Sequence, residues 1–98
     1  MTHICLEQVG KQYTVKCQGH ATGSVEACAA VSCLVYTLAG WLRNTSVVKL
    51  DEKLEAGDAL IRFCGGDAAE TAFDMITVGF LQLQEQYGEY ISVDFRVI

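Results

Sequence analysis

Residues 19–43 read GHATGSVEACAAVSCLVYTLAGWLR and contain the one long apolar run of the chain. The pattern is helical from Val25 to Arg43, and Ser24 or Thr22 is placed to cap this helix, because a side-chain oxygen there would accept an early backbone N–H. The apolar residues of this helix are too widely distributed around it to form a single stripe: Cys28, Val31, Leu34, Val35, Leu38, Trp41 and Leu42. We therefore expect a sheet to cover one side of the helix and a second helix or a second subunit to cover another, which predicts a homodimer.

The apolar run from Ala27 to Leu42 is interrupted by Ser32 and Thr37, and it is shorter than the roughly 20 residues that cross a bilayer. We interpret it as a buried helix and expect no membrane partner. The N-terminus lacks a basic segment followed by an apolar one, which argues against a signal peptide. An odd number of scattered cysteines also argues against a secreted disulfide framework and predicts a reducing, cytoplasmic location. These cysteines are Cys5, Cys17, Cys28, Cys33 and Cys64.

Length and charge limit the class of protein. A chain of 98 residues, 51% of them hydrophobic and with no linker-like or repetitive segment, predicts one domain over residues 1–98. The net charge is −5, and the 7 basic residues are spread singly along the chain. Binding to nucleic-acid phosphates needs clustered Lys and Arg, so we expect no nucleic-acid partner.

Two hairpins are expected, one on each side of this helix in the sequence. Residues 2–8 and 12–18 are rich in β-forming side chains and flank Val9-Gly10-Lys11. Residues 47–54 and 59–64 show a similar pattern around a turn at Glu55-Ala56-Gly57-Asp58.

The remainder of the chain completes an α+β fold. Asp67 and Glu70 resemble a capping box that starts a second helix over residues 68–87, and residues 90–97 close the chain as a strand. The order is then β-β-α-β-β-α-β. It predicts a single domain with a predominantly antiparallel or mixed sheet and two helices packed on one face.

His20 and Cys28 are the candidate catalytic residues. Gly19-His20-Ala21 precedes Cys28 by a short bend, which would let the two side chains meet. A thiolate attacks carbonyl carbon far better than a thiol does, and an adjacent imidazole can take the thiol proton. Cys28 also falls near the start of the expected helix, where the backbone N–H groups favour negative charge and would bind an oxyanion.

The neighbouring residues fit a site but do not require one. Gly19 lets the backbone turn before His20, and Ser32 follows Cys28 by one helical turn. An apolar helix more often buries a cysteine for packing, a His at a strand end is more often solvated, and Ser32 would ordinarily bond back to the Cys28 carbonyl. Local sequence alone therefore leaves catalysis and simple packing both open.

Gly19-His20-Ala21 followed by Cys28-Ala29-Ala30-Val31-Ser32 resembles the signature of the bacterial ribosomal-processing cysteine protease family, Prp. The length and the expected order of elements are also similar. The resemblance implies a homodimeric, cytoplasmic endopeptidase that needs no cofactor and no metal. It implies as substrate a protein with a cleavable N-terminal extension, namely a ribosomal large-subunit protein or a phage structural protein. It places the nucleophile at Cys28 and the base at His20.

Two positions differ from the family pattern. The segment between His20 and Cys28 is short, whereas family members carry a longer, glycine-bearing loop there. Val25 stands where family members have Asp, so Glu26 or Ser24 would have to orient the imidazole or cap the helix instead. These differences motivate an alternative function, a non-catalytic dimeric interaction domain that kept the fold but lost or altered the activity.

A metal site is a weaker alternative, suggested by Cys17, His20 and Cys28 within a short span. No Cys-x-x-Cys pair or second His cluster supports it. Strand alternation would also place Cys17 and His20 on opposite faces of the sheet. We therefore expect no metal.

Overall fold

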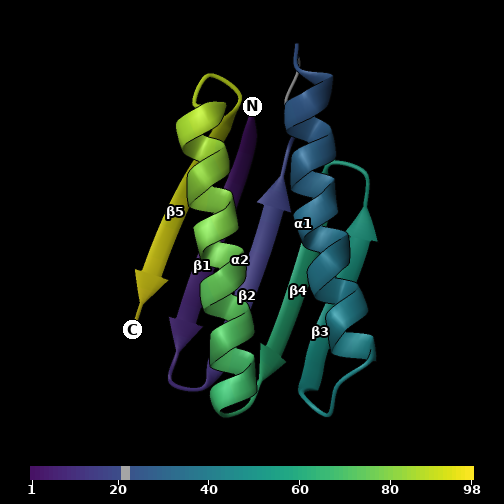
Figure 1. Cartoon of the computed structure of the whole chain (residues 1–98), viewed down its shortest axis with the longest axis vertical. Helices are drawn as coiled ribbons and strands as arrows, with labels where there is room; N and C mark the ends of the chain where they lie inside the picture. Colours follow the sequence, from purple (N-terminus) through teal and green to yellow (C-terminus); the bar gives the residue numbers. More distant parts are fainter. Residues whose placement is uncertain (21–22) are drawn as a thin grey trace.

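A computed structural model describes residues 1–20 and 23–98 of the chain. The elements follow one another as two β-hairpins, each succeeded by a helix, and a last strand (Figure 1). The predicted order β-β-α-β-β-α-β is confirmed. In chain order the elements are β1 (Thr2–Val9), β2 (Gln12–Gln18), α1 (Val25–Arg43), β3 (Val48–Glu55), β4 (Asp58–Cys64), α2 (Asp67–Gln86) and β5 (Ile91–Val97).

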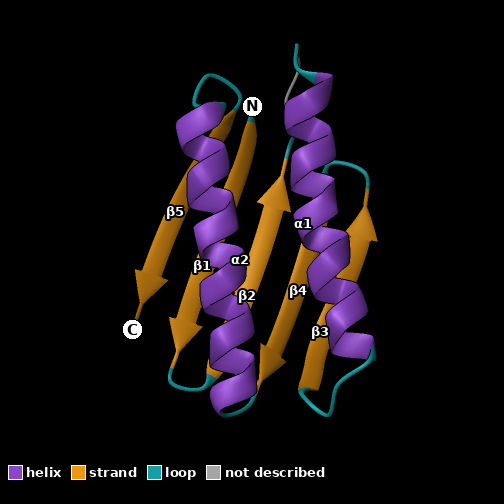
Figure 2. Ribbon diagram, viewed as in Figure 1, coloured by secondary structure: helices purple, strands orange, loops and turns teal. Residues whose placement is uncertain are grey.

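The strands form a mixed sheet in the order β3-β4-β2-β1-β5, in which β1 pairs with β5 in parallel and all other neighbours are antiparallel. Helix α1 connects β2 to β3 at one edge of the sheet, and α2 connects β4 to β5 at the other edge. The two connections leave β2 and β4, which run in opposite directions, and they cross toward opposite edges of the sheet. Crossovers of the same hand then place both helices on the same face, as Figure 2 shows.

The core fills the space between the helices and this face of the sheet. Side chains alternate along β1 and β2, so that Ile4, Tyr13 and Val15 are buried toward the helices. The Tyr13 ring packs against Phe63 and Phe73, with centroids 5.4 and 5.0 Å away. The opposite face of β1 is exposed. The sheet therefore has one apolar face and the helices cover it.

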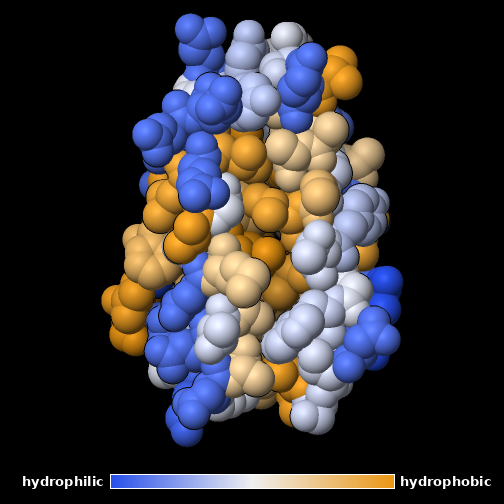
Figure 3. All heavy atoms as spheres, viewed as in Figure 1, coloured by the Kyte–Doolittle hydropathy of each residue, from blue (hydrophilic) through white to orange (hydrophobic). Residues whose placement is uncertain are grey.

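Helix α1 is buried along the side that meets the sheet, at Ala27, Val31, Val35, Leu38, Ala39 and Leu42. By length and composition it could also cross a membrane, but here it forms part of the core. The second helix expected beside it is α2: Leu34 lies against Gly79, where an added Cβ would come within 3.0 Å of the Leu34 side chain. Figure 3 shows apolar side chains gathered between the two helices.

The capping-box prediction for α2 is wrong. The helix begins at Asp67, one residue earlier than expected, and its N-cap is Gly66, which makes no side-chain capping bond. Gly65 and Gly66 carry the chain from β4 directly into the helix, so Asp67 is already helical and cannot act as the cap. Asp67 and Glu70 instead lie in the first turn, where negative charge interacts favourably with the helix dipole.

Replacing Phe73 by Ala will lower the free energy of unfolding by about 3–5 kcal/mol, because the ring is fully buried and contacts Tyr13. Val78→Ala is the matched control on the same helix. Its side chain is 53% exposed, so the change should stay within about 0.5 kcal/mol. Urea unfolding followed by circular dichroism measures both, and equal losses would contradict this account of the core.

Candidate active site

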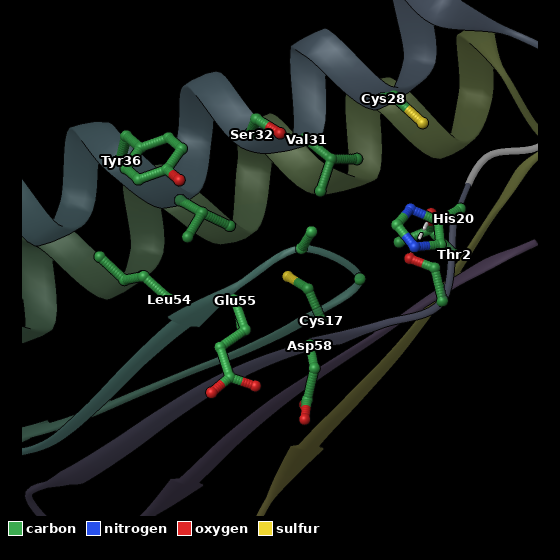
Figure 4. Close-up of a pocket in the computed structure, with 15 residues that line it drawn as sticks. Thr2, Cys17, His20, Cys28, Val31, Ser32, Tyr36, Leu54, Glu55 and Asp58 are labelled. Carbon is green, nitrogen blue, oxygen red and sulfur yellow. Dashed lines mark hydrogen bonds between the residues drawn. The ribbon is translucent and has the colours of Figure 1, made fainter.

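A cavity of about 250 Å³ opens between the first half of α1 and the turn that joins β3 to β4. Its other walls are the end of β2 and the start of β1. Figure 4 shows Cys28 on α1 with His20 below it at the same end of the cavity, whereas Tyr36 and Leu54 lie toward the other end. Two residues from different elements, both predicted as catalytic, therefore share one cavity.

Cys28 is half-buried in the first turns of α1. Ser24 caps this helix: its Oγ accepts a hydrogen bond from the Ala27 N–H at 3.1 Å, and its carbonyl accepts one from the Cys28 N–H at 3.2 Å. The other candidate cap, Thr22, lies outside the described residues. The cap fixes where the helix begins and so fixes the position of Cys28 in the region that favours negative charge.

The expectation of oxyanion donors beside Cys28 needs a correction. The N–H groups of Ala27 and Cys28 are both used by Ser24, one in capping and one in the helix. The remaining first-turn N–H groups, those of Val25 and Glu26, precede the helical hydrogen-bond ladder. A negative oxygen bound at this helix end would therefore approach the very start of α1 rather than the backbone of Cys28.

His20 reaches the cavity because Gly19 breaks the strand pattern. Gly19 has φ +87°, a conformation that suits glycine, and a Cβ there would collide with the Met1 carbonyl oxygen. Its N–H donates to the Gly57 carbonyl at 2.9 Å, and Thr2 Oγ1 donates to its carbonyl at 3.4 Å. The prediction that Cys17 and His20 face opposite sides is wrong, since both line the cavity once the chain turns at Gly19.

The predicted supporting residues divide into two groups. Gly19 and Ser32 line the cavity with the two catalytic candidates. Ser24 and Glu26 are not among the described residues that line it: Ser24 caps the helix, and Glu26 is an exposed acid in the first turn. Ala21 lies outside the described residues.

Sequence reasoning missed part of the cavity wall. Tyr36 follows Ser32 by one helical turn, so the spacing of Cys28, Ser32 and Tyr36 was a usable signal. The turn formed by residues 55–58 gave no such signal, although all four of its residues line the cavity. Its position depends on the pairing of β4 with β2, which only the three-dimensional structure supplies.

The turn brings negative charge to the edge of the cavity. Lys53 Nζ lies 2.6 Å from Asp58 Oδ2 and 3.7 Å from Glu55 Oε2. The hydrogen bond from Lys53 lowers the pKa of the Asp58 carboxyl, and the same bond raises the pKa of Lys53. Both groups therefore keep their charges at neutral pH, and the ion pair bridges the ends of β3 and β4.

Cys17 also faces the cavity but has a different chemical environment. It is only 5% exposed, and burial raises the pKa of its thiol to about 12. A thiol that stays protonated is a poor nucleophile, so Cys17 contributes to the wall and not to the reaction. Among the described residues, no three His, Cys, Asp or Glu side chains are grouped as a metal site requires.

Comparison with known protein families identifies the family of this chain. The family model of the cysteine protease Prp matches residues 1–92. The chain belongs to the Prp family. The resemblance inferred from the sequence is thereby confirmed, and the protein is a cysteine protease. No curated protein sequence matches the chain.

Solved structures share this fold, among them those of a Prp protease. The ribosomal processing protease Prp of S. aureus, bound covalently to a product peptide, superposes with a TM-score of 0.84 at 22% identity, over 97% of this chain and 99% of that one. The same protease with a substrate peptide gives 0.74 at 18% identity, over 97% and 99%. SMU.848 of Streptococcus mutans gives 0.73 at 18% identity, over 100% and 96%.

The buried thiol of Cys17 predicts a specific loss of stability in alkali. Between its ordinary pKa of 9.0 and its folded pKa of about 12, the unfolded chain releases the proton and the folded chain keeps it. Stability is therefore intact below pH 9 and falls as the pH rises, by at most about 1.4 kcal/mol per pH unit from this group. Cys17→Ala should flatten the decline measured by urea unfolding between pH 8 and 10.5.

The matched control is Cys33→Ala, because Cys33 is exposed on α1. Its side chain is not buried, so its removal should leave the decline of stability with pH the same as in the parent protein. If the free energy of unfolding declined equally with pH in the two variants, burial of Cys17 would not be the cause of the loss of stability in alkali.

Proposed function

We propose that this protein is an endopeptidase that removes an N-terminal extension from a protein precursor, with Cys28 as nucleophile and His20 as its base. The observation that carries the proposal is that these two side chains, from α1 and from the end of β2, line the same cavity. Cys28 further lies near a capped helix N-terminus, where the helix dipole interacts favourably with negative charge that develops during the reaction.

The reaction follows from these positions. The His20 imidazole takes the proton of Cys28 Sγ, and the thiolate attacks the scissile carbonyl carbon. The imidazolium then protonates the leaving amine as the C–N bond breaks, which leaves a thioester on Cys28. Water, deprotonated by His20, attacks the thioester and releases the carboxylate product with the thiol restored.

The relatives support a protein substrate. The S. aureus neighbour is a ribosomal processing protease and is solved with a product peptide linked covalently and with a substrate peptide. We extend this to the present chain and propose as substrate the extended precursor of a large-subunit ribosomal protein, or of a phage structural protein. The proposed location is cytoplasmic, supported by thiols at Cys5, Cys17, Cys33 and Cys64 that form no disulfide.

We also propose a homodimer. A groove of about 530 Å³ runs between α1 and α2 and is lined largely by apolar side chains, among them Trp41, Ala72 and Met75. Met75 is 69% exposed in the isolated chain. An apolar groove of this kind on a small domain is typical of an interaction surface.

Incubation with extended ribosomal and capsid precursors, followed by mass determination of the products, tests the proposed reaction. We expect one cut that releases the extension. Cys28→Ser should abolish it, and His20→Ala should lower kcat/KM by about 10²–10⁴-fold, as expected for loss of a general base.

Cys33→Ser and His3→Ala are the matched controls, because both side chains are exposed and neither lines the cavity. Both should cut normally, and circular dichroism should show the same fold for all four variants. Undiminished cutting by Cys28→Ser would disprove the assignment of the nucleophile. Binding of the precursors without any cut would instead favour the non-catalytic interaction domain.

Sedimentation equilibrium tests the dimer. The 10.7 kDa chain should sediment at about twice this mass, and Met75→Glu should shift it to the monomer by placing a charge in the groove. Val97→Glu is the control, since Val97 is 62% exposed on β5 and lies outside the groove. Dissociation by Val97→Glu alone would place the interface elsewhere.

A further inference from the structure

The imidazole of His20 lies directly against Gly57 in the turn between β3 and β4. A Cβ built on Gly57 would overlap the ring at Nε2, and it would lie 2.8 Å from Cε1 and 3.1 Å from Cδ2. Real Cβ atoms essentially never come within 3.0 Å of a heavy atom outside their own residue and its neighbours in the chain. The ring therefore occupies the space that any side chain at position 57 would need.

Gly57 also holds the main chain that precedes His20. Its carbonyl accepts the hydrogen bond of the Gly19 N–H at 2.9 Å. The turn itself is tied across its ends by the ion pair of Lys53 with Asp58, at 2.6 Å. Gly57 thus lies directly against the His20 ring and also, through its hydrogen bond with Gly19, holds the main chain that leads to His20.

We propose that Gly57 is a positioning residue for the reaction, which sets the place of the His20 imidazole opposite Cys28. This inference rests on the proposed function, in which His20 is the base. Proton transfer from a thiol to an imidazole requires hydrogen-bond contact between them. A shift of the ring by about 1 Å breaks such a contact and is expected to cost about 10²-fold in rate.

The chain provides a matched control for substitutions at Gly57. Gly57 has φ +71°, so a side chain there also strains the backbone. Gly10, in the turn between β1 and β2, has φ +60° and nothing within 4 Å of its added Cβ. The same substitution at Gly10 therefore imposes similar strain, at the other end of β2, without touching His20.

The first readout is the rate at which iodoacetamide alkylates Cys28, resolved from the other cysteines by mass spectrometry and measured from pH 5 to 10. Gly57→Ala should lower the rate at pH 7 by about tenfold or more and bring the pH profile close to that of His20→Ala. Gly10→Ala should leave the profile unchanged. The exposed Cys33 serves as the internal reference for each sample.

The second readout is a double-mutant cycle. In the His20→Ala background, Gly57→Ala should have no further effect on Cys28 alkylation, because the imidazole that Gly57 is proposed to position is already absent. The kcat/KM for cleavage of the precursor should fall about 10²-fold in the single variant Gly57→Ala. A purely structural role would lower stability without changing the shape of the pH profile.

Gly57→Asn and Gly10→Asn repeat the comparison if the alanine variant does not fold, since Asn tolerates positive φ while still carrying a Cβ. A Gly57 variant that keeps the parent pH profile, while His20→Ala changes it, would overturn this inference and leave the proposed dyad standing. An unchanged profile in His20→Ala would remove the dyad and the inference together.

Discussion

The antiparallel pairing of β2 with β4 is the contact on which the candidate site depends. The register runs from Gln12 opposite Cys64 to Gln18 opposite Asp58, and the next pair places Gly19 beside Gly57. A slip by one residue would turn every side chain of β2 to the other face of the sheet. Tyr13 and Val15 would then leave the core, so burial of the core also fixes the position of His20.

Helix α1 joins the core to the site in a similar way. Val31 and Val35 are buried against the sheet and also line the cavity, while Cys28 lies on the turn before them. The wall of the cavity is thus made of close-packed core side chains, which hold the thiol at a fixed height above the sheet. Because Ser24 sets the first residue of the helix, the cap and the core together determine where Cys28 lies.

Much of this arrangement could be predicted from local sequence. The helices and the hairpins follow from periodicity and turn residues, and a recognisable motif singles out His20 and Cys28, which line one cavity. The turn of residues 55–58 could not be placed, because its approach to His20 requires β4 to lie beside β2 rather than at an edge of the sheet. Strand order depends on contacts distant in sequence, and no local pattern encodes it.

Local rules failed where glycine changed the backbone. Strict alternation after Cys17 would have turned His20 away, but Gly19 at positive φ redirects the chain toward the cavity. The glycine was visible in the sequence, whereas its conformation was not. Gly66 similarly allows α2 to begin without the side-chain cap that Asp67 was expected to supply.

The two thiols of the cavity show how burial distinguishes chemical roles within one site. Cys17 lies on β2 in the core, and the loss of solvent raises its pKa to about 12, so it remains protonated under any physiological condition. Cys28 is half-buried and lies at a helix N-terminus, where the backbone favours a negative sulfur. A carbonyl group entering the cavity would therefore meet a deeply buried thiol that stays protonated and a half-buried thiol at a helix N-terminus. Burial depth and helix position are thus the structural differences that favour Cys28 over Cys17 as the proposed nucleophile.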